Sequence, residues 1–388
     1  MTQIPVMRPT IGEEEAAAAA AAIASGWVAQ GPRVREFEQR FAERVGAADA
    51  VAVSSGTAAL HLALLLAGVG PGDDVVVPSL SFIATANAVR HAGANPVFAD
   101  VELATQNLTA ETIGARLTPR TKAVVVVHQA GVPADLEAIH GLLDPLGIAV
   151  VEDAACAAGA THRGAPIGAG SPQVTFSFHP RKLLTTGEGG MLAVRDPADA
   201  VRGRRLREHG MSVDAAQRAA AERVVVESYA ETGFNYRMTD IQAAVGIVQL
   251  GRLDGIVERR RQRAERYREL LAGIDGLLTI ADPPHGATNY QSYWALLPDD
   301  CRATVVEVLE RLLAAGISGR RGIMAAHLEP AYEGHPHDPL PVTEKLADRS
   351  LILPLHDDFD DAGQERVAEA LELALADRDR DYAAVARS

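Results

Sequence analysis

The feature that most constrains the fold is a regular alternation of short apolar runs and helical stretches between Ala50 and Val194. Runs such as Val124 to Val127 have no polar face, which is typical of strands covered on both sides of a sheet. Alternation of this kind predicts an α/β fold with a mostly parallel, doubly wound sheet. We predict its strands at residues 51–53, 75–77, 96–99, 123–127, 149–152, 174–177 and 191–194.

The remaining pattern separates a large unit from a smaller one. Helices are expected at 58–67, 83–91, 110–116, 135–143 and about 239–270. After Gly273 the pattern changes to strands near Leu277 and at 293–297, followed by helices at 305–315 and about 364–375. We therefore expect a large α/β domain over 31–270 and a smaller C-terminal α+β domain over 271–388. The N-terminal segment, 1–30, is expected to join the small domain and the active site.

Charge and cysteine content exclude several classes of protein. The 51 acidic residues outnumber the 37 basic residues and give a net charge of −14, which repels nucleic acid and anionic membranes. The only cysteines are Cys156 and Cys301, too few for a disulfide framework. The apolar run 16–23 follows three glutamates, whereas a secretory signal begins with cations, and no run reaches the roughly 20 residues of a membrane span. We expect a cytoplasmic protein that binds small molecules.

Lysine is rare in this chain, and one lysine lies in a chemically distinctive setting. Only Lys122, Lys182 and Lys345 occur, and the first and last have the settings of surface residues. Asp153 ends a buried strand, at the edge where open parallel sheets bind ligands. Lys182 follows another strand 29 residues later (182 − 153). A structural ion pair is the ordinary explanation for such an aspartate and lysine.

A sharper interpretation is pyridoxal phosphate chemistry. That cofactor requires a lysine amine for its carbonyl, a carboxylate for its ring nitrogen and a cradle for its phosphate. Lys182 and Asp153 supply the first two. The turn at 54–60 precedes a helix, so its N–H groups suit a phosphate, although Ser-Gly-Thr is equally a helix cap. Phe82, at the end of the next strand, could stack on a flat ring.

Several motifs then occur in a recognisable order. They are Gly-Trp-Val-Ala-Gln-Gly-Pro at 26–32, Ser-Gly-Thr-Ala-Ala-Leu at 55–60, Glu-Asp-Ala-Ala at 152–155, Ser-Phe-His-Pro-Arg-Lys at 177–182, Gly-Glu-Gly-Gly at 187–190 and Gly-Phe-Asn-Tyr-Arg-Met at 233–238. With them the chain resembles, nearly end to end, the DegT/DnrJ/EryC1/StrS family of sugar aminotransferases. The resemblance implies the fold-type I architecture and pyridoxal 5'-phosphate, which becomes pyridoxamine phosphate in the second half-reaction.

The resemblance also implies roles for individual residues around the cofactor. Lys182 would carry the cofactor and act as the acid and base of the reaction. Asp153 would hold the ring nitrogen, and Phe82 would cover one ring face. The phosphate would contact Gly56, Thr57 and Ser177 and, from the neighbouring subunit, Asn235, which implies a homodimer with active sites at its interface. Cys156 departs from the family pattern, in which many members have a glutamine near the ring oxygen.

The substrate side is less specific. By resemblance the amino donor is L-glutamate and the acceptor is a keto sugar, most often a nucleotide-diphosphate-linked 3- or 4-keto-6-deoxyhexose. Acceptor contacts are expected from the residues Trp27, Gln30, Glu188, Tyr293, Arg320 and His327. Such enzymes serve amino-sugar biosynthesis for antibiotics or polysaccharides. No metal site is expected, because His335 and His337 lie in an ordinary proline-containing loop.

Three alternatives stay open at this point. The acceptor could be a cyclitol ketone of an aminoglycoside-type pathway, because the family includes such enzymes. A non-catalytic regulator of the same fold would leave Lys182 and Asp153 idle. A nucleotide-dependent oxidoreductase would need a glycine fingerprint after the first strand, which is missing. Relatives that dehydrate sugars have histidine in place of the lysine, and Lys182 argues against that branch.

Overall fold

The computed structural model describes residues 3–213, 218 and 221–376. Its main sheet has seven strands in the order β1-β9-β8-β5-β4-β2-β3. All strands run parallel except β9, which is antiparallel to both of its neighbours. The predicted strands are confirmed, with bounds β1 (Asp49–Val53), β2 (Asp74–Pro78), β3 (Asn95–Ala99), β4 (Thr121–Val127), β5 (Ala149–Asp153), β8 (Gln173–Ser177) and β9 (Gly190–Val194).

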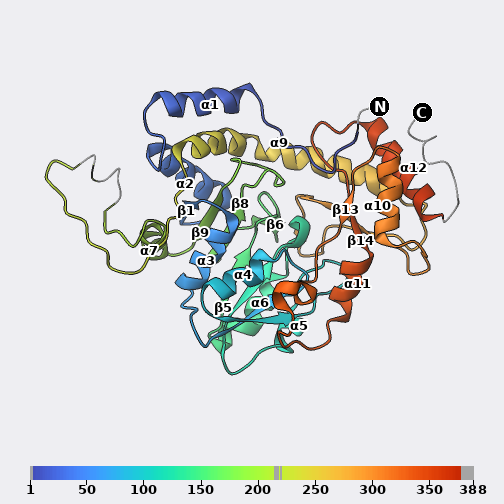
Figure 1. Cartoon of the computed structure of the whole chain (residues 1–388), viewed down its shortest axis with the longest axis horizontal. Coiled ribbons are helices and arrows are strands. Elements are labelled where there is room, and N and C mark those ends of the chain that lie inside the picture. Colours follow the sequence, from blue (N-terminus) through green and yellow to red (C-terminus); the bar gives the residue numbers. More distant parts are fainter. Residues whose placement is uncertain (1–2, 214–217, 219–220, 377–388) are drawn as a thin grey trace.

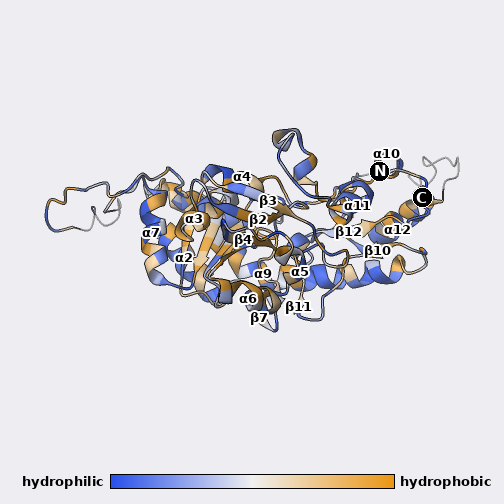
Figure 2. Ribbon diagram, turned by 90° about the horizontal axis from the view of Figure 1, so that it is seen from below, coloured by the Kyte–Doolittle hydropathy of each residue, from blue (hydrophilic) through white to orange (hydrophobic). Residues whose placement is uncertain are grey.

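Helices cover both faces of this sheet, which is why its strands are mostly apolar (Figure 2). Val51 and Val53 of β1 belong to the core beneath one group of helices, whereas Ala50 and Ala52 point into the core on the other face. The first face is covered by α3 (Gly56–Leu66), α4 (Ala84–His91) and α7 (Pro197–Arg207). The second is covered by α2 (Pro32–Val45), α5 (Ala110–Gly114), α6 (Leu136–Leu143) and α9 (Asp240–Leu270).

A second, antiparallel sheet has the strand order β10-β12-β14-β13. Its strands are β10 (Leu278–Thr279), β12 (Tyr293–Leu296), β14 (Ser350–Leu353) and β13 (Arg320–Arg321), and its helices are α10 (Val305–Ala314), α11 (Pro341–Arg349) and α12 (Asp361–Leu375). One apolar core contains both Val124 of the main sheet and Trp294 of the second sheet. The long helix α9 runs alongside both units (Figure 1). The units are therefore joined by packing as well as by the chain.

The N-terminal segment crosses from one unit to the other. Ile4 forms a parallel bridge with Ile317, beside the second sheet. The following helix, α1 (Glu13–Ala24), lies along α9 (Figure 1). Its start is capped because Glu15 accepts the Gly12 N–H at 2.8 Å, which explains the glutamate at position 15. Gly26, with φ of 82°, turns the chain away after the helix.

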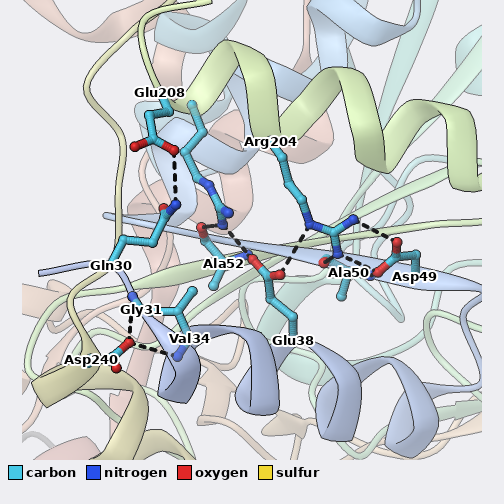
Figure 3. Close-up of polar contacts among 11 residues, drawn as sticks. Gln30, Gly31, Val34, Glu38, Asp49, Ala50, Ala52, Arg204, Glu208 and Asp240 are labelled. Carbon is cyan, nitrogen blue, oxygen red and sulfur yellow. Dashed lines mark hydrogen bonds and ion pairs between the residues drawn. The ribbon is translucent and has the colours of Figure 1, made fainter. Parts of the chain in front are cut away.

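A buried ionic network fixes α2 and α7 to the edge strand β1 (Figure 3). Glu38 of α2 is 3% exposed and accepts the Ala52 N–H at 2.9 Å. It also receives a guanidinium hydrogen bond from Arg207 and another, of 3.2 Å, from Arg204. Arg204 is further held by both carboxylate oxygens of Asp49, at 2.8 and 2.6 Å. Charges that are buried together in this way must keep all their partners.

A projecting segment and a small sheet lie outside the two main sheets. Residues 221–229, called the arm below, project from the body of the molecule (Figure 1). Val224 is 94% exposed and Val226 is 84% exposed, so the arm carries unshielded apolar side chains. A small third sheet joins β6 (Thr161–His162) to β7 (Ala165–Pro166) and β11 (Gly286–Ala287). Among the described residues, no helix has the length and apolar content needed to cross a membrane.

Candidate active site

The buried carboxylate of Asp153 lies at the end of β5, in the middle of the main sheet. The residue is 6% exposed. Its Oδ1 accepts the N–H of Ala155 at 3.1 Å, and its Oδ2 accepts the hydroxyl of Thr85 at 3.0 Å. Burial raises the pKa of Asp153, while these hydrogen bonds and the charge of Lys182 oppose the rise. A buried carboxylate in this position favours a cationic ligand group, because the cation compensates the carboxylate for the water that it loses on burial.

Lys182 and Cys156 meet at the same edge of the sheet. Cys156 lies in the turn after β5, and Lys182 lies in the turn after β8, the strand beside β5. The turn is closed by the Lys182 N–H, which donates to the carbonyl of His179 at 2.8 Å. The Nζ of Lys182 donates to the Sγ of Cys156 at 3.1 Å. Adjacent parallel strands thus bring the lysine and the cysteine together across 26 residues of sequence.

The start of α3 provides a cradle for an anion. Ser55 caps the helix, since its Oγ accepts the Ala58 N–H at 3.1 Å. The N–H groups of Gly56 and Thr57 belong to the first turn, where no intrahelical acceptor exists. A Cβ added to Gly56 would lie 2.9 Å from the Cβ of Ser177. Glycine is therefore required at position 56 for α3 to approach the end of β8, so the first turn of α3, with Gly56 and Thr57, lies against Ser177.

An exposed aromatic ring belongs to the segment that also carries Thr85, the residue that donates a hydrogen bond to Asp153. Phe82 is 63% exposed, in the connection between β2 and α4. Its carbonyl accepts the N–H of Thr85 at 3.1 Å, and Thr85 is the residue that donates to Asp153. A large apolar side chain left uncovered at the ligand edge of the sheet fits the face of a flat ligand. The residues present thus fit pyridoxal phosphate at its ring, its carbonyl and its phosphate.

The second sheet contributes a guanidinium group to this edge. Arg320 of β13 is half-buried, and burial lowers its pKa, while the electrostatic interaction with Cys156 opposes the change. The neighbouring Arg181 lowers the pKa of Arg320 further. Among the described residues Arg320 has no ion-pair partner, whereas Arg321 is exposed and pairs with Glu329 at 3.2 Å. Arg320 is thus a cation without an anion at the candidate site.

Two amide side chains that sequence reasoning missed brace the site from the connection before β12. Asn289 donates to the carbonyls of Cys156, at 2.9 Å, and Ala158, at 2.8 Å. Gln291 donates to the carbonyl of Arg181 at 2.5 Å. Their partners are separated from them by more than 100 residues, so no spacing in the sequence could have revealed the contacts. They fix the turns that carry Cys156 and Lys182.

Two predicted substrate contacts are buried in the structure. Tyr293 is 1% exposed and packs against Tyr267 with ring centroids 4.9 Å apart, and burial raises the pKa of Tyr293 to about 12. His327 is 4% exposed, with its Nδ1 2.6 Å from the Oγ of Ser79. Both side chains are committed to packing between elements. Neither has surface to offer a substrate, and we do not propose a substrate role for them.

The other predicted contacts lie on the surface. Trp27 is 36% exposed after α1, and Glu188 is exposed, 4.0 Å from His179. Gln30 donates to Glu208 at 3.0 Å (Figure 3). Asn235 is exposed, and its backbone forms an antiparallel bridge with that same Glu208. The structure thus brings Gln30 and Asn235 together through Glu208, but it shows no contact from any of these four residues to Lys182.

The histidines considered as a weak metal signal have ordinary environments. His335 lies with its Nε2 2.7 Å from the carbonyl oxygen of Pro96, and His337 is exposed. Within the described ranges, no group of three or more metal-ligating side chains is present.

The comparisons with known proteins agree with this geometry. The sequence matches the DegT/DnrJ/EryC1/StrS aminotransferase family over residues 9–372. The fold is similar to that of the aminotransferase TlmJ from Streptoalloteichus hindustanus, with 40% identity, a TM-score of 0.88, and coverage of 96% of this chain and 99% of TlmJ.

Two further solved structures are similar over almost their whole length. DesI, determined in the presence of its TDP-sugar product, has 34% identity and a TM-score of 0.88, and the match covers 100% of this chain and 96% of DesI. Spr1654 from Streptococcus pneumoniae, described as a sugar aminotransferase, was determined in PMP and PLP forms. The PMP form has 26% identity and a TM-score of 0.90, and the match covers 96% of this chain and 99% of Spr1654.

Proposed function

Because this chain belongs to the DegT/DnrJ/EryC1/StrS aminotransferase family, we propose that it transfers an amino group from L-glutamate to a nucleotide-diphosphate-linked 3- or 4-keto-6-deoxyhexose. Pyridoxal-phosphate-dependent amino transfer is the activity of the family to which this chain belongs, and the sugar acceptor is part of the proposal. The donor, the nucleotide and the position of the ketone are the proposed part. The observation that carries the proposal is that Asp153 and the Lys182–Cys156 contact lie at one edge of the main sheet, where Arg320 of the second sheet, which has no ion-pair partner among the described residues, interacts electrostatically with Cys156.

Different residues of this chain would bind different parts of the cofactor. Asp153 would hold the ring nitrogen, Lys182 the carbonyl carbon, and the first turn of α3 with Ser177 the phosphate. When bound, the cofactor supplies an electron sink for the carbon that loses its proton. Lys182 would take that proton on Nζ and return it to the cofactor carbon on the other side of the transferred nitrogen. Cys156 would contact the ring oxygen less strongly than the glutamine of other members, because a thiol is a weak hydrogen-bond partner.

Arg320 would bind an anionic group of the substrates. Its guanidinium is half-buried beside Cys156, and a buried cation gains most from a carboxylate or a diphosphate. L-glutamate carries two carboxylates, and a nucleotide-linked sugar carries a diphosphate. The TDP-sugar product of DesI, at 34% identity, supports a nucleotide-linked acceptor here.

We also propose a homodimer as the active form. Asn235 is exposed and shares Glu208 with Gln30, so a neighbouring subunit could meet both side chains on one surface. The arm offers Val224 and Val226 to the same partner, since exposed apolar side chains typically mark protein interfaces. Trp27 and Gln30 are proposed to contact the acceptor at this boundary.

Substrate panels test the proposed function. The purified protein is incubated with L-glutamate and either nucleotide-linked 3-keto or 4-keto sugars or cyclitol ketones, and formation of 2-oxoglutarate is measured. Turnover with a nucleotide-linked sugar, absent in Lys182→Ala, is the expected result. Turnover with cyclitol ketones alone would contradict the proposed acceptor and show that the acceptor is a cyclitol ketone. Failure to turn over any ketone, together with failure to bind pyridoxal phosphate, would contradict the proposal and favour a regulatory protein.

A further inference from the structure

The surroundings of Asp153 differ from those usual for a buried carboxylate. The residue is 6% exposed and forms no ion pair within the described part of the chain. Its two hydrogen-bond donors are neutral groups, the Ala155 N–H and the Thr85 hydroxyl. Burial raises the pKa of Asp153, and the hydrogen bond from Thr85 is one of the interactions that oppose the rise. These two donors, together with electrostatic interactions from Lys182 and His128, favour the ionised form, and Thr85 is the side chain that contacts the carboxylate directly.

Thr85 is itself held by a second buried hydroxyl. Thr85 and Ser81 are each 2% exposed, and their hydroxyl oxygens lie 2.8 Å apart. An ionised carboxylate can only accept, so Thr85 must donate to Asp153 and Ser81 must donate to Thr85. The two hydroxyls form a short relay that points toward the charge. Because hydrogen bonds in such a chain polarise one another, Ser81 strengthens the donor that reaches Asp153.

The relay and the exposed ring come from one short segment. Thr85 lies in the first turn of α4, and its N–H donates to the carbonyl of Phe82 at 3.1 Å. The N–H of Ser81 donates to the carbonyl of Ser79 at 2.9 Å, which fixes the other end of the segment. Phe82 is 63% exposed, whereas the hydroxyls on both sides of it are buried, that of Ser81 against Thr85 and that of Thr85 against Asp153.

We propose that Thr85, supported by Ser81, is a positioning residue that keeps the Asp153 carboxylate ionised and oriented for the ring nitrogen of the cofactor. The inference rests on the proposed function, since it assigns Asp153 to that nitrogen. Thr85 does not touch the reacting atoms. It acts through Asp153, so its loss affects the recognition of the ring nitrogen more than the recognition of the phosphate.

Binding of two ligands separates this role from a merely structural one. The probes are pyridoxal phosphate and its 1-deaza analogue, in which a carbon replaces the ring nitrogen, and both affinities are measured on the unloaded protein. The wild type should prefer pyridoxal phosphate. Thr85→Val removes the donor while keeping the shape, and we expect the preference to fall about tenfold, because hydrogen bonds to charged groups have this strength. Thr85→Ser restores the hydroxyl and should keep the preference within about threefold of the wild type.

Thr175→Val is the matched control. Thr175 is 1% exposed and pairs with Asp153 across β5 and β8, but its hydroxyl donates to the backbone carbonyl of Glu152 at 3.1 Å. Its loss should leave the ligand preference unchanged. Ser81→Ala, which leaves Thr85 in place, should lower the preference for pyridoxal phosphate over the 1-deaza analogue by about threefold. This variant provides the test if Thr85→Val does not fold.

The outcomes distinguish this inference from the proposed function. A wild type that binds neither ligand contradicts both. A wild type that prefers pyridoxal phosphate, with the same preference in Thr85→Val and Ser81→Ala, overturns the inference alone. Equal loss of preference in Thr175→Val would also overturn it, because disturbance of the strand would then explain the effect.

Discussion

At the scale of single residues, Arg320 provides the sharpest contrast with its neighbour. Arg320 is half-buried without an ion pair among the described residues, and Arg321 is exposed and paired with Glu329. We expect Arg320→Gln to raise the KM of L-glutamate or of the keto sugar by about tenfold or more, because a desolvated charge–charge contact is lost. Arg321→Gln should change either KM by less than about twofold. Initial rates with each substrate varied in turn measure both, and an unchanged KM in Arg320→Gln would remove this role.

His61 determines part of the pH dependence of stability. It is 4% exposed in α3, with its Nδ1 3.1 Å from the Tyr236 hydroxyl. Burial, and then the charge of His91, lower the pKa of His61 from 6.5 to about 4. The unfolded chain therefore binds a proton more readily between those values, so stability is full above pH 6.5 and falls as the pH drops toward 4.

The loss of stability that His61 causes at low pH can be measured. The His61 contribution should lower the free energy of unfolding by about 2 kcal/mol at pH 5 relative to pH 7.5. The melting temperature should fall between these pH values in the wild type, and the fall should be smaller in His61→Gln, which keeps a hydrogen-bond partner for Tyr236. Equal falls in both proteins, measured by scanning calorimetry, would assign the pH dependence to other groups.

At the scale of elements, the sequence patterns predicted the strands of the main sheet more completely than the helices that pack on it. Apolar runs such as 124–127 marked every strand of the main sheet, because strands that are buried on both faces are mostly apolar. Helix α2 was not predicted, although Val34, Phe37 and Phe41 lie at helical spacing and are fully buried. Strand β14 is only four residues long, and an apolar run of that length does not distinguish a strand from a helix.

Some residues of the candidate site could be predicted from the sequence and others could not. Lys182, Asp153 and the start of α3 stand out in the sequence, because each places a reactive or polar group at the end of an element. Thr85 and Asn289 do not, since hydroxyls and amides are common and only the folded sheet brings them to Asp153 and Cys156. Tyr293 was a candidate contact whose apolar surroundings in β12 instead place it in the core.

The network around Glu38 tests how α2 is held. Glu38→Ala leaves Arg207 buried without its carboxylate and removes the acceptor of the Ala52 N–H. Breaking a buried pair in this way should lower the free energy of unfolding by about 3 kcal/mol or more. Glu36→Ala, on the same helix, removes only surface pairs with Arg33 and Arg40 and should cost less than about 1 kcal/mol. Denaturant or thermal unfolding measures the difference, and similar values for the two variants would contradict a supporting role for the network.

At the scale of the whole molecule, two units share one core and meet at the candidate site. We propose a domain boundary near residue 270, where α9 ends, with the N-terminal segment crossing back over it. Lys182 comes from the large unit and Arg320 from the small one, so relative movement of the units would change the distance between the cofactor and the anionic substrate.

The proposed dimer predicts complementation between two inactive variants. Lys182→Ala lacks the reactive amine, and Asn235→Ala should lack the phosphate contact that it offers to the neighbouring subunit. A mixed dimer regains one intact site, formed by Lys182 of one chain and Asn235 of the other. Random mixing should therefore restore about a quarter of the wild-type activity. If mixed dimers form, as shown by differently tagged chains, and stay inactive, Asn235 does not act across the interface.

The central claim is that Lys182 carries pyridoxal phosphate, and reduction of the loaded protein with borohydride tests it most directly. The chain has three lysines, of which Lys122 is exposed and Lys345 pairs with Asp299 at 2.8 Å, so peptide mapping can assign the adduct without ambiguity. We predict a yellow protein whose visible band is bleached by L-glutamate and whose reduced adduct lies on Lys182. A colourless protein that takes up no added pyridoxal phosphate, or an adduct on Lys122 or Lys345, would contradict the account.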